Sequence, residues 1–145
     1  MPKRGDMSDR QNGHKTFLSR DAIRGLSDVK TEEVHIPEWQ AYVMVRGMTA
    51  AERDAFEQSN IVGKGKNRDV NLRNYRAKLV IWSCVDEDGK RLFSETDAEW
   101  LGDKSAAALS RIVDVASRLS GISEQDVEEL TADLGNGQPA DLLSA

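Results

Sequence analysis

The sequence predicts an α+β fold, a mainly helical single domain that carries one N-terminal β-hairpin between disordered termini. The segment 31–46 alternates apolar and polar residues and is rich in β-forming side chains, which favours two strands. The segments 69–85 and 104–119 repeat apolar residues three and four positions apart, as one face of a helix does. The balance of 39% hydrophobic and 31% charged residues in a chain of 145 residues is typical of one globular domain with a modest core.

Composition sets the expected boundaries of this domain. Residues 1–16 are polar, carry many charges and include Pro and Gly, so they cannot bury enough apolar surface to hold a structure. The last residues again combine Gly, Pro and small side chains. We therefore expect a disordered leader at 1–16, a single α+β domain at 17–134 and a flexible tail at 135–145.

The first predicted elements are a short helix and the hairpin. Gly25 or Ser27 ends the short helix, which four apolar residues anchor: Phe17, Leu18, Ile23 and Leu26. Val34 and Ile36 then alternate with polar neighbours, and the stretch PEWQA makes the turn before a second strand at 42–46. Because an isolated hairpin is marginally stable in water, it has to pack on helices.

The centre of the chain contains two predicted helices. Thr49 and Glu52 form a capping box, in which each side chain accepts a hydrogen bond from the other residue's backbone amide, and the glycines of IVGKGKNR end this helix. The stretch DVNLRNYRAKLVIWSCV, residues 69–85, is the strongest helix candidate, because four residues share one face: Leu72, Tyr75, Leu79 and Trp82. After the turn DEDGK, we expect Leu92 and Phe93 to return to the core.

Three further helices are predicted. Thr96 and Glu99 make a second capping box, for a short helix that ends near Gly102. A longer helix follows at about 104–119, with Gly121 as its stop and a stripe of Leu109, Ile112, Val113, Ala116 and Leu119. The last, acidic helix lies in SEQDVEELTADL, and three of its apolar residues share a face: Val127, Leu130 and Leu134.

Composition also narrows the location and the class of function. No apolar run approaches the length of a membrane span and the N-terminus has no apolar signal core, so we expect no membrane association and a chain that stays in the cytoplasm. Cys84 is the single cysteine, which excludes an internal disulfide and fits a reducing compartment. The net charge of −5 argues against a protein whose main partner is nucleic acid.

The charge is unevenly distributed along the chain. Residues 124–145 carry six acids and no base. Opposed to them is a basic run that contains a single acid, Asp69, among six cations: Lys64, Lys66, Arg68, Arg73, Arg76 and Lys78. This pattern fits either two solvated faces of opposite sign or charge complementarity, within the domain or with a partner.

The stretch CVDEDGKRLFSE imitates a calcium loop. Asp86, Asp88, Gly89 and Glu95 stand at the third, fifth, sixth and twelfth positions of such a loop. The first position, however, is Cys84, where a hard cation needs an oxygen ligand, and two basic residues lie inside the loop. We interpret the stretch as a polar turn and predict no metal site.

The sequence contains no set of residues that predicts catalysis. His14 lies in the leader, and His35 alternates with apolar neighbours and should face solvent. Cys84 follows an apolar helix and is expected to be a buried, unreactive residue. One cysteine and two distant histidines give no zinc spacing, and GKGKN lacks the hydroxyl and the strand–helix context of a phosphate-binding loop. We predict no enzymatic activity, no catalytic residue and no cofactor.

Protein binding therefore remains the favoured class of function. Aromatic residues anchor many interfaces, and Trp39 lies in the hairpin turn, where exposure to a partner and packing back on a helix are both open. Trp82 and Trp100 lie on predicted helices and are expected in the core. The alternative is a nucleic-acid-associated protein that uses the basic run at 64–78, in which Asn67, Asn71 and Tyr75 are interleaved with the cations.

Several collinear stretches together resemble a known protein family. They are FLSRDAI, KTEEVHIPEW, VMVRGMTAAERDAFE, GKGKNRDVNLRNYRAKLVIWSCVDEDGKRLFS and LGDKSAAALSRIVDVASRLSGISEQDVEEL, and they cover about 17–130. The chain is similar to the tail assembly chaperones of tailed bacteriophages with long, tape-measured tails. No single motif is diagnostic, and the order of the whole set carries the resemblance.

The resemblance implies a small, non-catalytic protein of the host bacterial cytoplasm. Members of the family hold the long helical tape measure protein in solution while tail tube subunits polymerise around it, and they are absent from the mature virion. The expected partners are therefore the tape measure protein, the tail tube protein and further copies of the chain itself. The family has no ligand motif to carry over, so our hypothesis for the contact residues comes from the apolar pattern: Trp39, Val127, Leu130 and Leu134.

Overall fold

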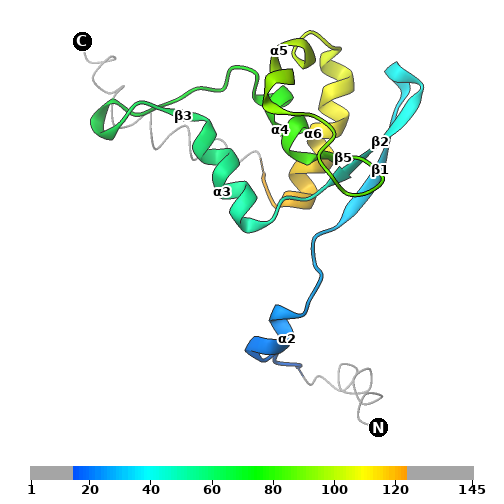
Figure 1. Ribbon diagram of the computed structural model, residues 1–145, viewed down its shortest axis with the longest axis vertical. Helices are drawn as coiled ribbons and strands as arrows, with labels where there is room; N and C mark the ends of the chain where they lie inside the picture. Colours follow the sequence, from blue (N-terminus) through cyan, green and yellow to red (C-terminus); the bar gives the residue numbers. More distant parts are fainter. Residues whose placement is uncertain (1–14, 124–145) are drawn as a thin grey trace.

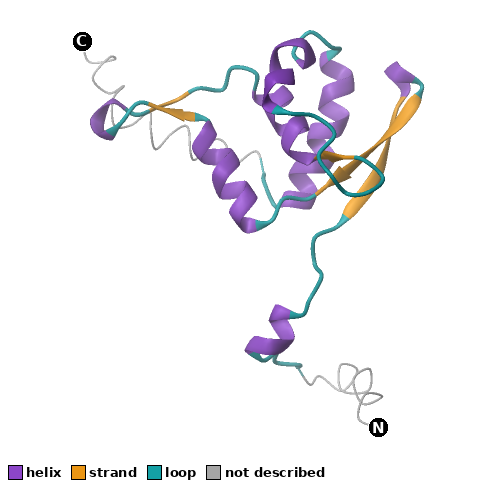
Figure 2. Cartoon of the chain, viewed as in Figure 1, coloured by secondary structure: helices purple, strands orange, loops and turns teal. Residues whose placement is uncertain are grey.

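The computed structural model describes residues 15–123. Its body combines a small antiparallel sheet with a group of packed helices, so the predicted mixture of helix and strand is confirmed (Figures 1 and 2). In chain order the elements are α2 (Arg20–Arg24), β1 (Thr31–Ile36), η1 (Pro37–Trp39), β2 (Ala41–Arg46), α3 (Ala50–Ser59), β3 (Ile61–Val62), η2 (Gly65–Asn67), β4 (Asp69–Val70), α4 (Tyr75–Ser83), β5 (Cys84–Val85), η3 (Glu95–Asp97), α5 (Ala98–Leu101) and α6 (Ala106–Ser120). The predicted acidic helix after Gly121, the flexible tail and residues 1–14 of the leader lie outside the described residues, apart from Ile122 and Ser123.

The main sheet has three strands in the order β1-β2-β5. β1 and β2 form the predicted hairpin, with Val34 opposite Val43, and they turn through the short 3-10 helix η1. β5 pairs with the other edge of β2 and places Cys84 opposite Val45. A second, two-stranded hairpin forms between β3 and β4. The prediction of a single hairpin is therefore incomplete, because β3 and β4 form a second hairpin and β5 adds a third strand to the main sheet.

The helices pack on this sheet and on one another. α6 contacts β1 and β2, and α4 packs against α6. α3 reaches α4 through Phe56, whose ring centroid lies 5.5 Å from that of Tyr75 and 6.2 Å from that of Trp82. The buried residues of both layers form one core: Val34, Ile36, Val45, Met48, Phe56, Ala77, Leu79, Val80, Ile81, Cys84, Leu101, Ala108, Leu109, Ile112, Ala116 and Ile122.

Local sequence signals start α3 and end α6 as predicted. At the start of α3 the capping box forms, since the Glu52 amide donates to Thr49 Oγ1 at 3.1 Å and the Thr49 amide donates to Glu52 Oε1 at 2.9 Å. α6 begins after Ser105, whose Oγ accepts from the Ala108 amide at 3.1 Å. It ends at Gly121, which has a φ of 73° that glycine adopts without steric cost.

The predicted helix at 69–85 is wrong at both ends. β4 occupies its first residues, and Asn74 adopts a left-handed φ of 60° immediately before α4 begins. Leu72 therefore lies outside the helix and is 38% exposed. At the other end, Cys84 has an extended backbone because it pairs with Val45 in the sheet. Tertiary pairing overrides the helical pattern at this point.

The second predicted capping box lies two residues too late. Ser94 and Asp97, rather than Thr96 and Glu99, make the box, and the Ser94 amide donates to Asp97 Oδ2 at 2.9 Å. Trp100 is also 45% exposed rather than part of the core. Its ring lies at the surface, where its Nε1 donates to Asp97 Oδ1 at 2.9 Å.

Among the described helices, none is both long and apolar enough to span a membrane.

Candidate interaction surfaces

The calcium-like loop is a polar turn whose carboxylate binds its own backbone. Asp86 Oδ1 accepts hydrogen bonds from the amide of Asp88 at 2.8 Å and from that of Lys90 at 3.0 Å. Within residues 15–123, no group of three or more His, Cys, Asp and Glu side chains is placed to hold a metal ion. After the turn Phe93 packs against the core as predicted, whereas Leu92 is 48% exposed, which corrects its expected place in the core.

His35 and Cys84 lie where the sequence predicts, and His14 lies outside the described residues. His35 is exposed, and its ring centroid lies 4.8 Å from that of Tyr42. Cys84 is fully buried, and burial raises the pKa of its thiol to about 12. A thiol with this pKa carries almost no reactive thiolate at neutral pH, so Cys84 is a packing residue.

The basic run is divided among three places in the fold. Lys64, Lys66 and Arg68 are exposed on the β3–β4 hairpin, which projects from the body (Figure 1). Arg73 Nη2 lies 3.7 Å from a Glu99 carboxylate oxygen on the surface, and Arg76 is exposed at the start of α4. The sixth cation has a structural role that the spacing along the chain does not indicate.

That sixth cation, Lys78, ties α4 to the end of α3. Its Nζ donates to Asn60 Oδ1 at 2.8 Å and to the Ser59 carbonyl at 3.0 Å. Asn60 is itself buried, so the lysine satisfies a buried amide oxygen. Partial burial lowers the pKa of Lys78. Lys78 is therefore not part of an open basic surface.

Trp39 packs back on the helices, which is one of the two placements that the sequence left open. It is half-buried and packs against the core, and η1 contacts α6. Next to it, the Glu38 carboxylate joins Arg111 of α6 through bonds of 2.9 and 3.2 Å. A partner could still reach the exposed part of the ring, so its contact role stays a prediction. The other three proposed contact residues, Val127, Leu130 and Leu134, lie outside the described residues.

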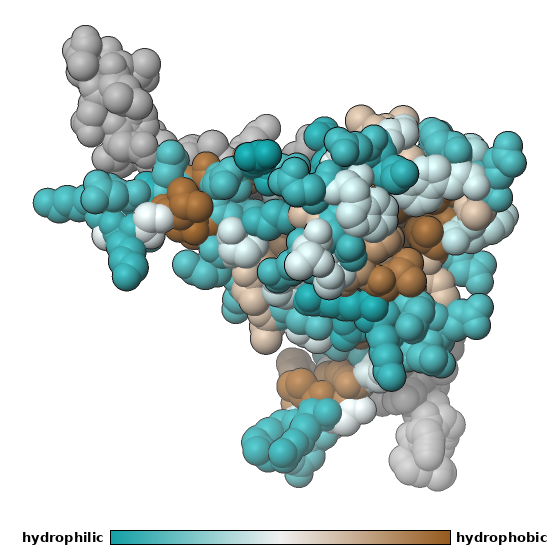
Figure 3. Space-filling model, turned by 45° about the horizontal axis from the view of Figure 1, so that its top comes forward, coloured by the Kyte–Doolittle hydropathy of each residue, from teal (hydrophilic) through white to brown (hydrophobic). Residues whose placement is uncertain are grey.

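The α2 segment, residues 17–26, presents an apolar surface. The helix forms as predicted, with Ser19 Oγ accepting from the Ala22 amide at 3.1 Å. Its apolar residues do not reach the core, however, and are 52–86% exposed: Phe17, Leu18, Ile23 and Leu26. α2 stands away from the body at the end of a connecting stretch of chain, and Figure 3 shows the hydrophobic surface that it carries.

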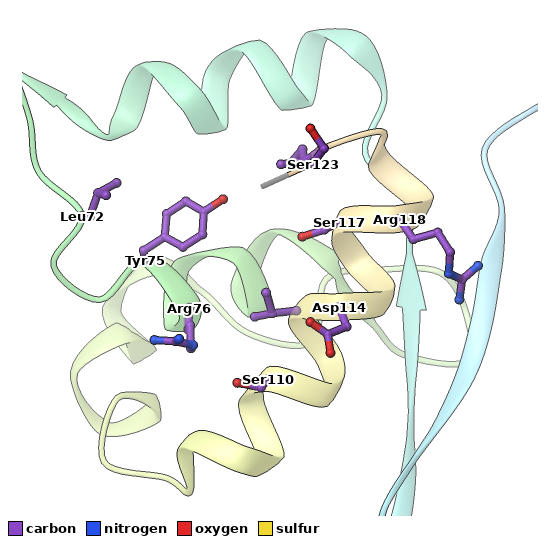
Figure 4. A pocket seen from close by; sticks show the side chains of 10 residues that line it. Leu72, Tyr75, Arg76, Ser110, Asp114, Ser117, Arg118 and Ser123 are labelled. Atoms are coloured by element: carbon purple, nitrogen blue, oxygen red, sulfur yellow. The ribbon is translucent and has the colours of Figure 1, made fainter. Parts of the chain in front are cut away.

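A groove lies between the start of α4 and one face of α6 (Figure 4). It encloses about 530 Å³. Apolar side chains of the α4 region and of α6 share it with arginine, aspartate and serine side chains. Its lining residues are Leu72, Tyr75, Arg76, Ser110, Val113, Asp114, Ser117, Arg118, Ile122 and Ser123.

The fold and these surfaces define a small α+β protein with exposed apolar and basic surfaces. Residues 18–132 match the family model described as phage tail assembly chaperone. The match covers most of the chain, which therefore belongs to the phage tail assembly chaperone family, as the collinear stretches indicated. A solved structure of the bacteriophage HK97 tail assembly chaperone is similar at 18% identity and a TM-score of 0.49, over 82% of this chain and 99% of that chain. A search of curated proteins gave no match.

Proposed function

We propose that the chain is a non-catalytic chaperone that binds the tape measure protein and helps recruit tail tube subunits while the phage tail assembles. It acts in the cytoplasm of the host bacterium and leaves before the virion is mature. Membership of the phage tail assembly chaperone family supports the role in tail assembly. The exposed apolar surface of the α2 segment supports the binding of a protein client.

The α2 segment has the properties that a temporary client contact requires. Burying one large aliphatic or aromatic side chain is worth about 1.5–3 kcal/mol, so the four exposed residues offer several kcal/mol before the costs of association. Only part of that remains as net affinity, and a contact of this strength can be replaced when tube subunits arrive. Residues 25–30, which join the segment to β1, contain no helix or strand.

Co-expression tests this function. We expect the tape measure protein to remain in the supernatant when the chain is co-expressed and to sediment when it is not. The double variant F17S/L26S removes two apolar residues that lie outside the helix α2 itself, so the helix is retained. It should leave several-fold less tape measure protein in the supernatant than the unchanged chain does.

The matched control is V62S/L92S, which removes two exposed apolar residues outside the α2 segment, one in β3 and one in the loop after β5. It should keep the client in solution as the unchanged chain does. Equal behaviour of the two double variants would remove the α2 segment from the client surface. A tape measure protein that sediments even with the unchanged chain would contradict the proposed function as a whole.

The tail tube protein is tested in the same way. When all three proteins are expressed together, a tagged chain should recover the tube protein with the tape measure protein. Recovery of the tape measure protein alone would leave client binding in place and contradict tube recruitment.

A further inference from the structure

The groove between α4 and α6 offers an apolar surface of limited size. Tyr75 and Val113 are half-buried, and Leu72 is 38% exposed although it is a large aliphatic side chain. In Figure 4 Leu72 and Tyr75 stand on one side of the groove, and the α6 residues stand on the other. A concave surface of this kind fits a short amphipathic segment better than it fits a flat protein surface.

The charges at the groove favour an acidic occupant. Arg76 is exposed, and it makes no ion pair with any residue in 15–123. Arg118 forms an ion pair with Glu32, and the Arg118 Nη2 lies 2.8 Å from a Glu32 carboxylate oxygen. Among the described residues that line the groove, Asp114 is the one acid. The electrostatic attraction for an acidic segment is therefore strongest on the side of Arg76 and weakest beside Asp114.

The chain itself delivers such a segment to the groove. Ser123 belongs to the groove lining, and residues 124–145 follow it directly. The stretch 124–134 contains five acids and no base, and its apolar residues are spaced three and four apart: Val127, Leu130 and Leu134. We infer that the groove is the docking site of the segment 124–134 of the same chain.

The tether makes this docking feasible at low intrinsic affinity. A short connection holds the segment near the groove at an effective concentration in the millimolar range. An intrinsic dissociation constant of about 0.1 mM then keeps the groove occupied for roughly nine-tenths of the time. Because the tether already restricts the segment to the neighbourhood of the groove, its three apolar residues have to offset a smaller cost of association than those of a free ligand.

Docking in cis would also regulate the chaperone, and this consequence rests on the proposed function. The apolar stripe of Val127, Leu130 and Leu134 is the surface that the sequence assigns to client or self contacts. While it lies in the groove it is covered, and a client helix has to displace it. The chain would thus expose this stripe only when a client competes for it.

Thiol labelling of the full-length chain tests the docking without any client. Ser117→Cys places a probe in the groove by exchanging one side-chain atom, and the native Cys84 is buried and does not compete. The rate of reaction with a bulky maleimide is measured for this variant alone and together with V127S/L130S/L134S, which removes the apolar stripe and leaves the charge unchanged. We expect the triple substitution to increase the labelling rate of the groove probe by about tenfold, as a groove occupied nine-tenths of the time requires.

Two controls separate docking from general effects of the tail. Ala107→Cys puts the probe on an exposed position of α6 outside the groove, where the triple substitution should not change the rate. L142S/L143S removes two leucines from the same tail beyond the docking segment and should leave the groove probe protected.

Equal labelling of the groove probe with and without the apolar stripe would overturn the proposal. Protection that increases with protein concentration would also overturn it, because the occupant would then come from a second copy. The readout is independent of the proposed function. A protected groove in a chain that fails to hold the tape measure protein in solution contradicts the function only, and an open groove in an active chaperone contradicts the docking only.

Discussion

The contact between the end of β2 and the end of α6 depends on the absence of a side chain at Gly47. This buried glycine follows β2, and a Cβ built on it would stand 2.6 Å from the Leu119 carbonyl oxygen and 3.0 Å from its carbonyl carbon. Both atoms belong to the backbone of α6, so they cannot move aside by a rotamer change. The same junction holds the hydrogen bond from the Met48 amide to Ser120 Oγ at 2.9 Å.

Gly47→Ala should therefore destabilise the fold by forcing the sheet and α6 apart. A Cβ rarely approaches another heavy atom more closely than 3.0 Å, so the two backbones have to separate by several tenths of an ångström. Overpacking of this kind costs about 1–3 kcal/mol. For a domain of about 100 residues, this corresponds to a fall in Tm of roughly 4–24 °C.

Thermal unfolding followed by circular dichroism measures the effect, and urea unfolding gives the free energy. Gly25→Ala is the matched control, because the nearest atoms to its added Cβ are 3.7 and 3.8 Å away, which is ordinary contact. It should change the free energy of unfolding by less than about 0.5 kcal/mol. If Gly47→Ala unfolds at the same temperature and urea concentration as this control, the close packing of β2 on α6 described above is refuted.

Three further predictions concern single residues. Thr49→Ala removes the cap of α3 and should lower the free energy of unfolding by about 0.5–2 kcal/mol in urea titrations, an interpretation that an unchanged midpoint would contradict. The hydrogen bonds from Arg111 hold the pKa of the Glu38 carboxyl below its ordinary value, so its contribution is present above about pH 4.3 and is lost as the pH falls through the lowered pKa. Glu38→Gln should consequently lose less stability on acidification than the unchanged chain, and identical acid profiles would argue against the pair. Burial and a pKa of about 12 keep Cys84 unreactive, so a small thiol reagent should label it only at the rate of unfolding, and rapid labelling of the folded chain would place the thiol at the surface.

Sequence patterns predicted the elements whose causes are local. The capping box of Thr49 and Glu52 starts α3 because both partners lie within one turn of each other. The apolar stripe of α6 and the left-handed stop at Gly121 define that helix almost completely. The alternation around Val34 likewise predicted the hairpin, since a strand with one buried face repeats every two residues.

The elements that the sequence did not predict depend on distant partners. β5 has only two residues, and Cys84 becomes a strand residue because Val45 lies opposite it, nearly 40 positions earlier in the chain. The helical spacing of Leu72 and Tyr75 extends across a turn, and α4 begins only after Asn74. Asn74 has a left-handed φ, which the pattern of apolar residues does not indicate.

The candidate interaction surfaces could be predicted even less well from the sequence. The spacing of the apolar residues in the α2 segment is the same for a helix packed on the core and for an exposed helix. Only the structure shows that these residues are exposed. Similarly, Lys78 belongs by sequence to the basic run, yet it is hydrogen-bonded to the buried Asn60. Spacing along the chain carries no information on which of these cations stays free for a partner.

Direct binding of the tape measure protein is the measurement that tests the central claim most directly. The purified chain is mixed with a purified helical segment of the tape measure protein and analysed by size-exclusion chromatography with light scattering. We predict a complex that contains both proteins and that F17S/L26S weakens, while V62S/L92S leaves it intact. Separate elution of the two unchanged proteins, at concentrations well above those of co-expression, would contradict the proposed function.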